Sequence, residues 1–224
     1  MNTRIRKFRF TIMELIVSMS VLAVMMVIMM EFFASAQKAW VASSEQADIY
    51  DNARVALDLI TSDINALYYK KSSKINFRSE DDLIGFMVYN SGKLTKIMYK
   101  RVDDDNDDDF CFFKRGDGKP GDYVNAASIS SVFADSSVDY KKVIPRVIDL
   151  EFKYYNKKME AFTEGDYKIP WFVEVKITLM GRNSFVKWKA FTEKNVSSKA
   201  EEIAKAHSVT VSKLITIGYR GQPD

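Results

Sequence analysis

Glu14 is the residue whose type and position are best suited to chemistry, because it lies at the head of a long apolar stretch. No charged residue occurs from Leu15 to Met30, and the wider segment 10–33 contains only Glu14 and Glu31 as charges. A charged side chain in hydrocarbon costs about 2.5–3.5 kcal/mol on insertion scales. A carboxylate held away from water is tolerated when it is paired. Glu14 is therefore predicted to be an assembly residue on a helix that enters a membrane first and an assembly later.

The residues around Glu14 give this helix a length and an orientation. The segment 10–33 has 24 residues, and a helix of that length rises about 36 Å, which is enough to cross a hydrocarbon core of about 30 Å. Basic residues stay on the cytoplasmic side of a membrane. We therefore expect a single pass through a bacterial inner membrane, with the N-terminus in the cytoplasm and the rest in the periplasm. The cations that decide this orientation lie in a basic leader, residues 1–9: Arg4, Arg6, Lys7 and Arg9.

Three interpretations of the N-terminal segment remain open. A cleaved secretory signal has an apolar core of about 7–15 residues followed by small residues. Cleavage after Ala36 would suit the small residues 34–36, although the apolar run itself already has 16 residues. A simple signal-anchor explains the basic leader and leaves Glu14 without a partner. An assembly helix explains both the leader and the carboxylate.

The third interpretation is supported by a resemblance to a known family. The run Phe10-Thr11-Ile12-Met13-Glu14-Leu15-Ile16-Val17 resembles the N-terminal processing and methylation signal of type IV pilins and type II secretion pseudopilins. The resemblance implies that a prepilin peptidase removes the leader before Phe10, which is then methylated. It also implies that Glu14 pairs with the terminal amine of a neighbouring subunit. The sequence departs from the family at Arg9, where the family has a small residue, usually glycine, so cleavage after Arg9 and a retained leader are both open.

The chain beyond the apolar stretch continues as an amphipathic helix. Neither glycine nor proline occurs in the segment 34–69, and apolar residues recur at steps of three or four along it. One helix is therefore predicted from about Phe10 to about Tyr69, with its second half packed on a sheet. The expected parts are a leader at 1–9, a membrane and assembly half at 10–33, an amphipathic half at 34–70 and a β-rich head at 71–224. The predicted core positions of the second half are Ile49, Ala53, Ala56, Ile60, Ile64 and Leu67.

Beyond residue 70 the apolar pattern changes toward the period of two that is typical of strands. Turns are predicted at 90–93 and 180–183, and a short helix at 197–207 with Ser197 or Ser198 as its cap and Glu201 and Glu202 in its first turn. The fold class is thus α+β, a long helix on an antiparallel sheet. Segment 143–180 resembles the J-type minor pseudopilins, and the ending 215–218 resembles pilin-like proteins of Verrucomicrobia-type gene cassettes. The predicted strands are 83–89, 94–102, 110–114, 147–155, 171–180, 184–191 and 214–219.

An acidic run is the one candidate for metal binding. Six aspartates lie between Asp103 and Asp109, and alternate carboxylates in a turn can offer several oxygens to one Ca²⁺ ion. Asp117 and Asp122 are candidate additional ligands. The run lacks the glycine at the sixth position of an EF-hand loop. A solvated acidic loop without a metal is the competing interpretation.

Other chemistry is not favoured by the sequence. The lone Cys111 lies among phenylalanines, as expected of a buried strand residue, and the lone His207 lies on the predicted short helix. There is no nucleophile elbow, phosphate-binding loop or dinucleotide fingerprint, so we expect no enzyme activity and no cofactor. The net charge of +3 includes the four cations of the leader. The basic excess is therefore confined to the N-terminus, and no nucleic-acid partner is expected.

These observations lead to a structural function. The expected protein is a minor pilin-like or pseudopilin-like subunit of a type IV pilus or a type II secretion filament. Its expected partners are other pilin or pseudopilin subunits, the prepilin peptidase, the inner-membrane assembly platform and membrane lipid. The alternative is a bitopic membrane protein whose periplasmic domain binds a ligand or a partner without polymerising. A secreted enzyme cleaved after Ala36 is a third and less favoured interpretation.

Overall fold

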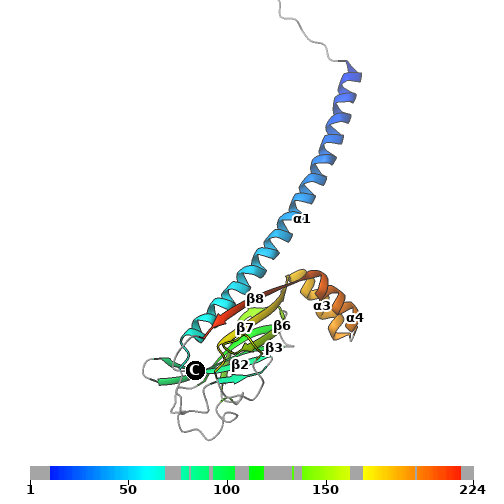
Figure 1. Cartoon of the computed structure of the whole chain (residues 1–224). Helices are drawn as coiled ribbons and strands as arrows, with labels where there is room; N and C mark the ends of the chain where they lie inside the picture. The colour runs from blue at the N-terminus through cyan, green and yellow to red at the C-terminus, as the bar shows by residue number, and fades with distance from the viewer. Residues whose placement is uncertain are drawn as a thin grey trace, which may run out of the picture. The chain divides into compact units, whose positions relative to one another are not determined.

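The structure is a computed structural model of the chain. It describes residues 11–68, 77–80, 82–90, 93–103, 111–118, 133, 138–161, 169–194 and 196–217. The chain divides into two compact units, Met1–Gln46 and Ala47–Asp224. One long helix and two antiparallel sheets give the α+β class that the sequence predicts (Figure 1).

Helix α1, Ile12–Asn65, has 54 residues and contains no glycine or proline that would interrupt it. Its buried residues begin at Ile49 and recur along one face of the second half. The predicted stripe is confirmed, since all its positions, including Leu67 just beyond the helix, are at most 6% exposed. Packing rather than propensity accounts for most of the stability of such a helix. The second half of α1 is thus fixed as part of the head.

The first sheet has five antiparallel strands in sequential order. Asn90 lies opposite Lys93, as expected for a hairpin, and the two residues between them lie outside the described residues. Two strands were not predicted: β1, which has three residues, and β5, which carries two adjacent lysines. The strands are β1 (Phe77–Ser79), β2 (Leu83–Asn90), β3 (Lys93–Asp103), β4 (Cys111–Gly118) and β5 (Val138–Pro145).

The second sheet has three strands, β6 (Val147–Tyr155), β7 (Phe172–Met180) and β8 (Ser208–Thr216), in that order. The chain passes from β5 into β6 through Arg146, whose φ of 60° lies in the left-handed region. Because of this turn, the chain passes directly from the last strand of the first sheet into the first strand of the second sheet. Strands β6 and β7 coincide with predicted strands almost residue for residue, and the predicted strand at 214–219 overlaps only the end of β8.

The prediction for the segment between β7 and β8 was wrong. The predicted turn at 180–183 and strand at 184–191 are the end of β7 and helix α3, Arg182–Glu193. Phe185 and Trp188 are three positions apart and lie on one side of this helix, where they pack together. Helix α4, Ser197–His207, has the predicted bounds. However, its cap position is Val196 with no side-chain bond, and its first turn has no acidic residue, so the predicted serine cap and glutamates are corrected.

The main core lies between the second half of α1 and the two sheets. Ile60 and Ile64 share it with Phe86 and Tyr99 from the first sheet and with Val175 from the second. Aromatic rings form a stack through this core, with ring centroids of Tyr99 and Phe113 5.2 Å apart. The stack and the helix stripe together bury one face of the five-stranded sheet.

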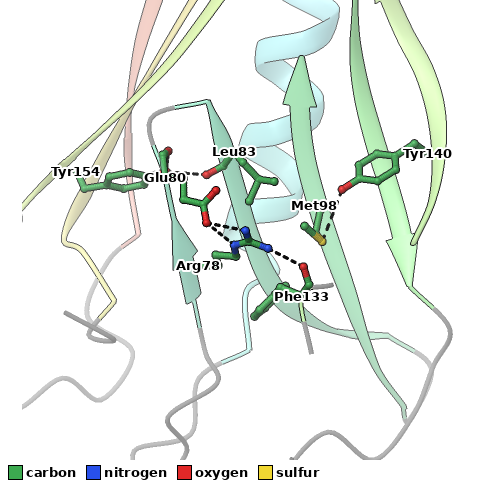
Figure 2. Close-up of polar contacts among 7 residues, drawn as sticks. All are labelled: Arg78, Glu80, Leu83, Met98, Phe133, Tyr140 and Tyr154. Atoms are coloured by element: carbon green, nitrogen blue, oxygen red, sulfur yellow. Dashed lines mark hydrogen bonds and ion pairs between the residues drawn. The ribbon is translucent and has the colours of Figure 1, made fainter. Parts of the chain in front are cut away.

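The other face of the five-stranded sheet is covered in part by Phe133. Its ring lies against Gly85, where an added Cβ would approach the ring to 2.9 Å, so only glycine permits this contact. Figure 2 shows Arg78 donating from Nη1 to the Phe133 carbonyl at 2.7 Å and from Nε to Glu80 at 2.7 Å. The Tyr154 hydroxyl donates to the Glu80 carbonyl at 3.1 Å. These bonds join strand β1 to both Phe133 and the second sheet.

Candidate functional site: an exposed apolar helix

The first part of α1 exposes its apolar residues on every side. All residues from Thr11 to Ser44 are exposed, among them Phe32 and Phe33, which are 69% and 57% exposed. Contiguous apolar surface beyond a few hundred Å² marks a site of membrane or protein contact. The helix is long and apolar enough to span a membrane by length and composition. Residues Ile12 to Phe33 rise about 33 Å, close to the thickness of a bilayer core of about 30 Å.

The two serine hydroxyls within this apolar segment are satisfied by the helix itself. Ser18 donates from Oγ to the Leu15 carbonyl at 2.9 Å, and Ser20 donates to the Ile16 carbonyl at 2.8 Å. Hydroxyls bonded back to the preceding turn need no external partner. These hydroxyls therefore meet the requirement that hydrocarbon places on polar groups, and the carboxylates of Glu14 and Glu31 are the charged groups that the segment carries.

Glu14 lies in the first turn of α1 and is exposed. Its backbone N–H donates to Thr11 Oγ1 at 3.3 Å, so Thr11 caps the helix. Thr11 and Glu14 have the spacing of a capping box, and a cap was not predicted although the T-x-x-E pattern is present in the sequence. A carboxylate in a first turn also complements the positive end of the helix dipole. Among the described residues no cation pairs with the Glu14 carboxylate.

The other two predicted processing residues, Arg9 and Phe10, lie outside the described residues, as does the leader. Glu31, the second charge of the segment, lies 17 positions after Glu14 on the same helix. The two carboxylates are therefore about 26 Å apart along the helix axis, with no charge between them. They mark the two ends of the uncharged surface.

An ion-pair network fixes the second half of α1 to the head. Asp63 on α1 accepts from Arg115 Nε at 2.6 Å and from the hydroxyl of Tyr99. Arg115 also pairs with Asp117 through Nη1. Burial and the hydrogen bond to Asp63 raise the pKa of the Tyr99 phenol above its ordinary value, so the phenol stays a donor. The network joins the helix to the adjacent strands β3 and β4.

The predicted calcium ligands do not converge where the structure describes them. Asp103 pairs with Arg101 at 2.7 Å and Asp117 pairs with Arg115. Asp103 lies opposite Cys111, six positions along β4 from Asp117, which corresponds to about 20 Å. Asp117 therefore cannot share one ion with Asp103. The remaining run 104–109 and Asp122 lie outside the described residues, and within the described ones no three acidic, histidine or cysteine side chains form a metal-binding group.

Cys111 is fully buried on β4, as the sequence predicts. Burial raises the pKa of its thiol to about 12, so the thiol stays protonated at neutral pH. His207 is the last residue of α4 and is exposed. The Cys111 sulfur accepts a hydrogen bond from Arg101 Nη2 at 3.5 Å.

The fold and the exposed helix thus define a class of architecture, an α+β head carried on a helix of membrane-spanning length. No known family model matches this chain, and no curated protein matches it in sequence.

Proposed function

We propose that this protein is a minor pilin-like or pseudopilin-like structural subunit, held in the inner membrane by the first half of α1 and then incorporated into a filament through that helix. The observation that carries the proposal is the carboxylate of Glu14, in the first turn of a helix whose apolar surface is exposed on every side. The N-terminal sequence motif supports the same conclusion.

Glu14 promotes assembly because its carboxylate is stabilised by pairing with a cation of another subunit. In lipid the carboxylate is costly, and in a bundle of helices it is stabilised when a cation of a neighbouring subunit pairs with it. The terminal amine of a neighbour whose chain begins at Phe10 has the matching charge and lies near the same depth. Pairing then sets the stagger between adjacent helices, and the apolar surface supplies the packing.

The bitopic alternative keeps the anchor and omits polymerisation. It is favoured by Arg9, which differs from the residue that the pilin family has at that position. It gives no reason for a carboxylate within the apolar segment beyond a favourable place at the positive end of the helix dipole, because the observed cap uses the backbone N–H of Glu14 and the Thr11 hydroxyl.

Glu14→Gln separates the charge from the cap, because glutamine also completes a capping box. We expect Glu14→Gln to insert into the membrane normally and to be lost from filaments, measured by immunoblot of membrane and sheared-filament fractions. Glu31→Gln is the matched control, since it removes the same charge at the other end of the segment, and it should be incorporated normally. Normal incorporation of Glu14→Gln contradicts the proposal and favours the bitopic alternative.

A further inference from the structure

Helices α3 and α4 occupy a place where the sheet needs only a short turn. Met180 at the end of β7 lies opposite Ser208 at the start of β8. Adjacent antiparallel strands in this register can be joined by two residues, but here residues 181–207 intervene. Figure 1 shows α3 and α4 side by side at this end of the two strands. Ordering each extra residue costs about 1–2 kcal/mol of backbone entropy. Because a two-residue turn would avoid this cost, we examine the exposed surface of the helix pair for a binding function.

The inner side of α3 holds the pair firmly to the head. Phe185 is 1% exposed and packs with Met180 and Cys111, and the ring centroids of Phe185 and Trp188 are 5.5 Å apart. Ile203 of α4 packs against the same cluster. The pair is therefore a fixed platform rather than a free appendage.

The outer side of α3 forms a cationic stripe with an apolar centre. Its members are exposed and recur every four residues from the first residue of α3 to its C-cap, Lys194. Val186 at the centre is 56% exposed. Lys187 lies beside the stripe, and within the described residues none of its cations has an ion-pair partner. We call this surface the α3 stripe: Arg182, Val186, Ala190 and Lys194.

The solvent side of α1 within the head forms an acidic stripe with an apolar centre. Its members lie at i, i+3, i+7 and i+10 and are exposed, with Val55 at 55%. Asp58 pairs with Arg54 at 3.6 Å and with Lys213 at 3.1 Å, whereas Asp48 and Asp51 have no ion-pair partner in the described part of the chain. We call this surface the α1 stripe: Asp48, Asp51, Val55 and Asp58.

We infer that the α3 stripe of one copy docks on the α1 stripe of a second copy of this chain. The stripes carry opposite charges at their ends and a valine within each. They also match in length, since 12 and 10 helical positions correspond to about 18 and 15 Å. Electrostatic complementarity of this kind fixes partner and register.

The consequence for assembly follows from the use of two different surfaces. A contact between unlike patches is heterologous, and unless its rotation closes a ring it extends into an open helical array. The inference therefore rests on the proposed function and names the contact between heads that accompanies packing of the apolar helices. Two linked contacts, each modest alone, bind far more tightly together.

The test is cysteine crosslinking between two differently tagged full-length copies in membranes. Val55→Cys in one copy and Val186→Cys in the other should give a crosslinked heterodimer. Two copies that both carry Val186→Cys, or both Val55→Cys, should not crosslink. Met159→Cys, 49% exposed in the bend that follows β6, is the matched control partner for Val55→Cys and should not crosslink. The native Cys111 is buried and does not compete.

Charge reversal tests the chemistry of the contact. Lys187→Glu with Lys194→Glu in the Val186→Cys copy should lower the crosslinking yield about tenfold, as loss of two exposed ion pairs implies. Asp48→Lys with Asp51→Lys in the Val55→Cys copy should do the same. Combining the two reversed copies should restore the yield. No restoration, or a Val186→Cys adduct only with a different protein or with another Val186→Cys, overturns the inference.

Cysteines in the apolar segment separate this inference from the proposed function. If Leu22→Cys copies crosslink with each other while Val55→Cys and Val186→Cys do not, the helices assemble and the head contact is wrong. If neither pair crosslinks, both the assembly and the head contact are wrong. Crosslinking of both pairs supports both.

Discussion

Asp63 is the residue whose loss should show how strongly α1 is fixed to its head. Asp63→Ala removes the partner of Arg115 and the acceptor of the fully buried Tyr99 hydroxyl. A buried donor left unsatisfied costs about 1–3 kcal/mol, and a hydrogen bond to a charged group contributes about 1.5–3 kcal/mol. Arg115 is 23% exposed and keeps its ion pair with Asp117. The loss in free energy of unfolding should therefore lie near the lower end of the sum of these two ranges, at about 3 kcal/mol.

The measurement is thermal and urea unfolding of the full chain in detergent. For a chain of this size, about 3 kcal/mol corresponds to a fall in Tm of about 6–12 °C. Asp58→Ala is the matched control, because Asp58 lies on the same helix, is 59% exposed and makes only surface pairs. Its loss should cost no more than about 1 kcal/mol. The change in helix propensity is the same in both variants and cancels. Equal effects of the two substitutions would refute the reasoning.

Two further outcomes follow from burial in the head. Because folding raises the pKa of Tyr99, the phenol loses its proton at a lower pH in the unfolded chain than in the folded protein. The contribution of Tyr99 to the free energy of unfolding should therefore be fully present below about pH 10 and fall as the pH rises above it. Urea midpoints from pH 8 to 11 should fall less steeply in Tyr99→Phe, and identical slopes would contradict this. Cys111, with its pKa raised to about 12, should resist iodoacetamide in the native protein and react in urea, as read by mass spectrometry. Rapid labelling of the native protein would show that the Cys111 thiol on β4 is accessible to solvent, which would contradict the prediction.

The long helix and its buried stripe could be predicted because both depend on local periodicity. Ile49 to Leu67 repeat at helical spacing over five turns, and nothing in the segment interrupts the pattern. Strands β6 and β7 were predictable for the same reason, since alternation over nine residues leaves little ambiguity.

Helix α3 was mistaken for a strand because its sequence also alternates. Val186 and Trp188 alternate with Lys187 and Lys189, which imitates a period of two. What decides in favour of a helix is contact with Met180 and Cys111, through Phe185 and Trp188 at helical spacing. Cys111 comes from a distant part of the chain, and tertiary packing of this kind overrides the local pattern.

The ion-pair network was not predictable from the sequence. Asp63 lies 36 positions from Tyr99 and 52 from Arg115, and nothing local relates the three. The candidate site, in contrast, could be predicted largely from the sequence. Glu14 and the apolar stretch were identified from composition alone, whereas the bond from Glu14 N–H to Thr11 required the structure.

The most direct measurement of the central claim is mass spectrometry of the N-terminal peptide from protein isolated from membranes. Pairing between subunits requires a terminal amine close to Glu14, so we expect the chain to begin at Phe10 and to carry a methyl group there. An intact Met1 would leave the amine nine residues away and support the bitopic alternative. A start at Gln37 would show that the whole apolar segment is removed as a signal peptide, and either result would contradict the claim.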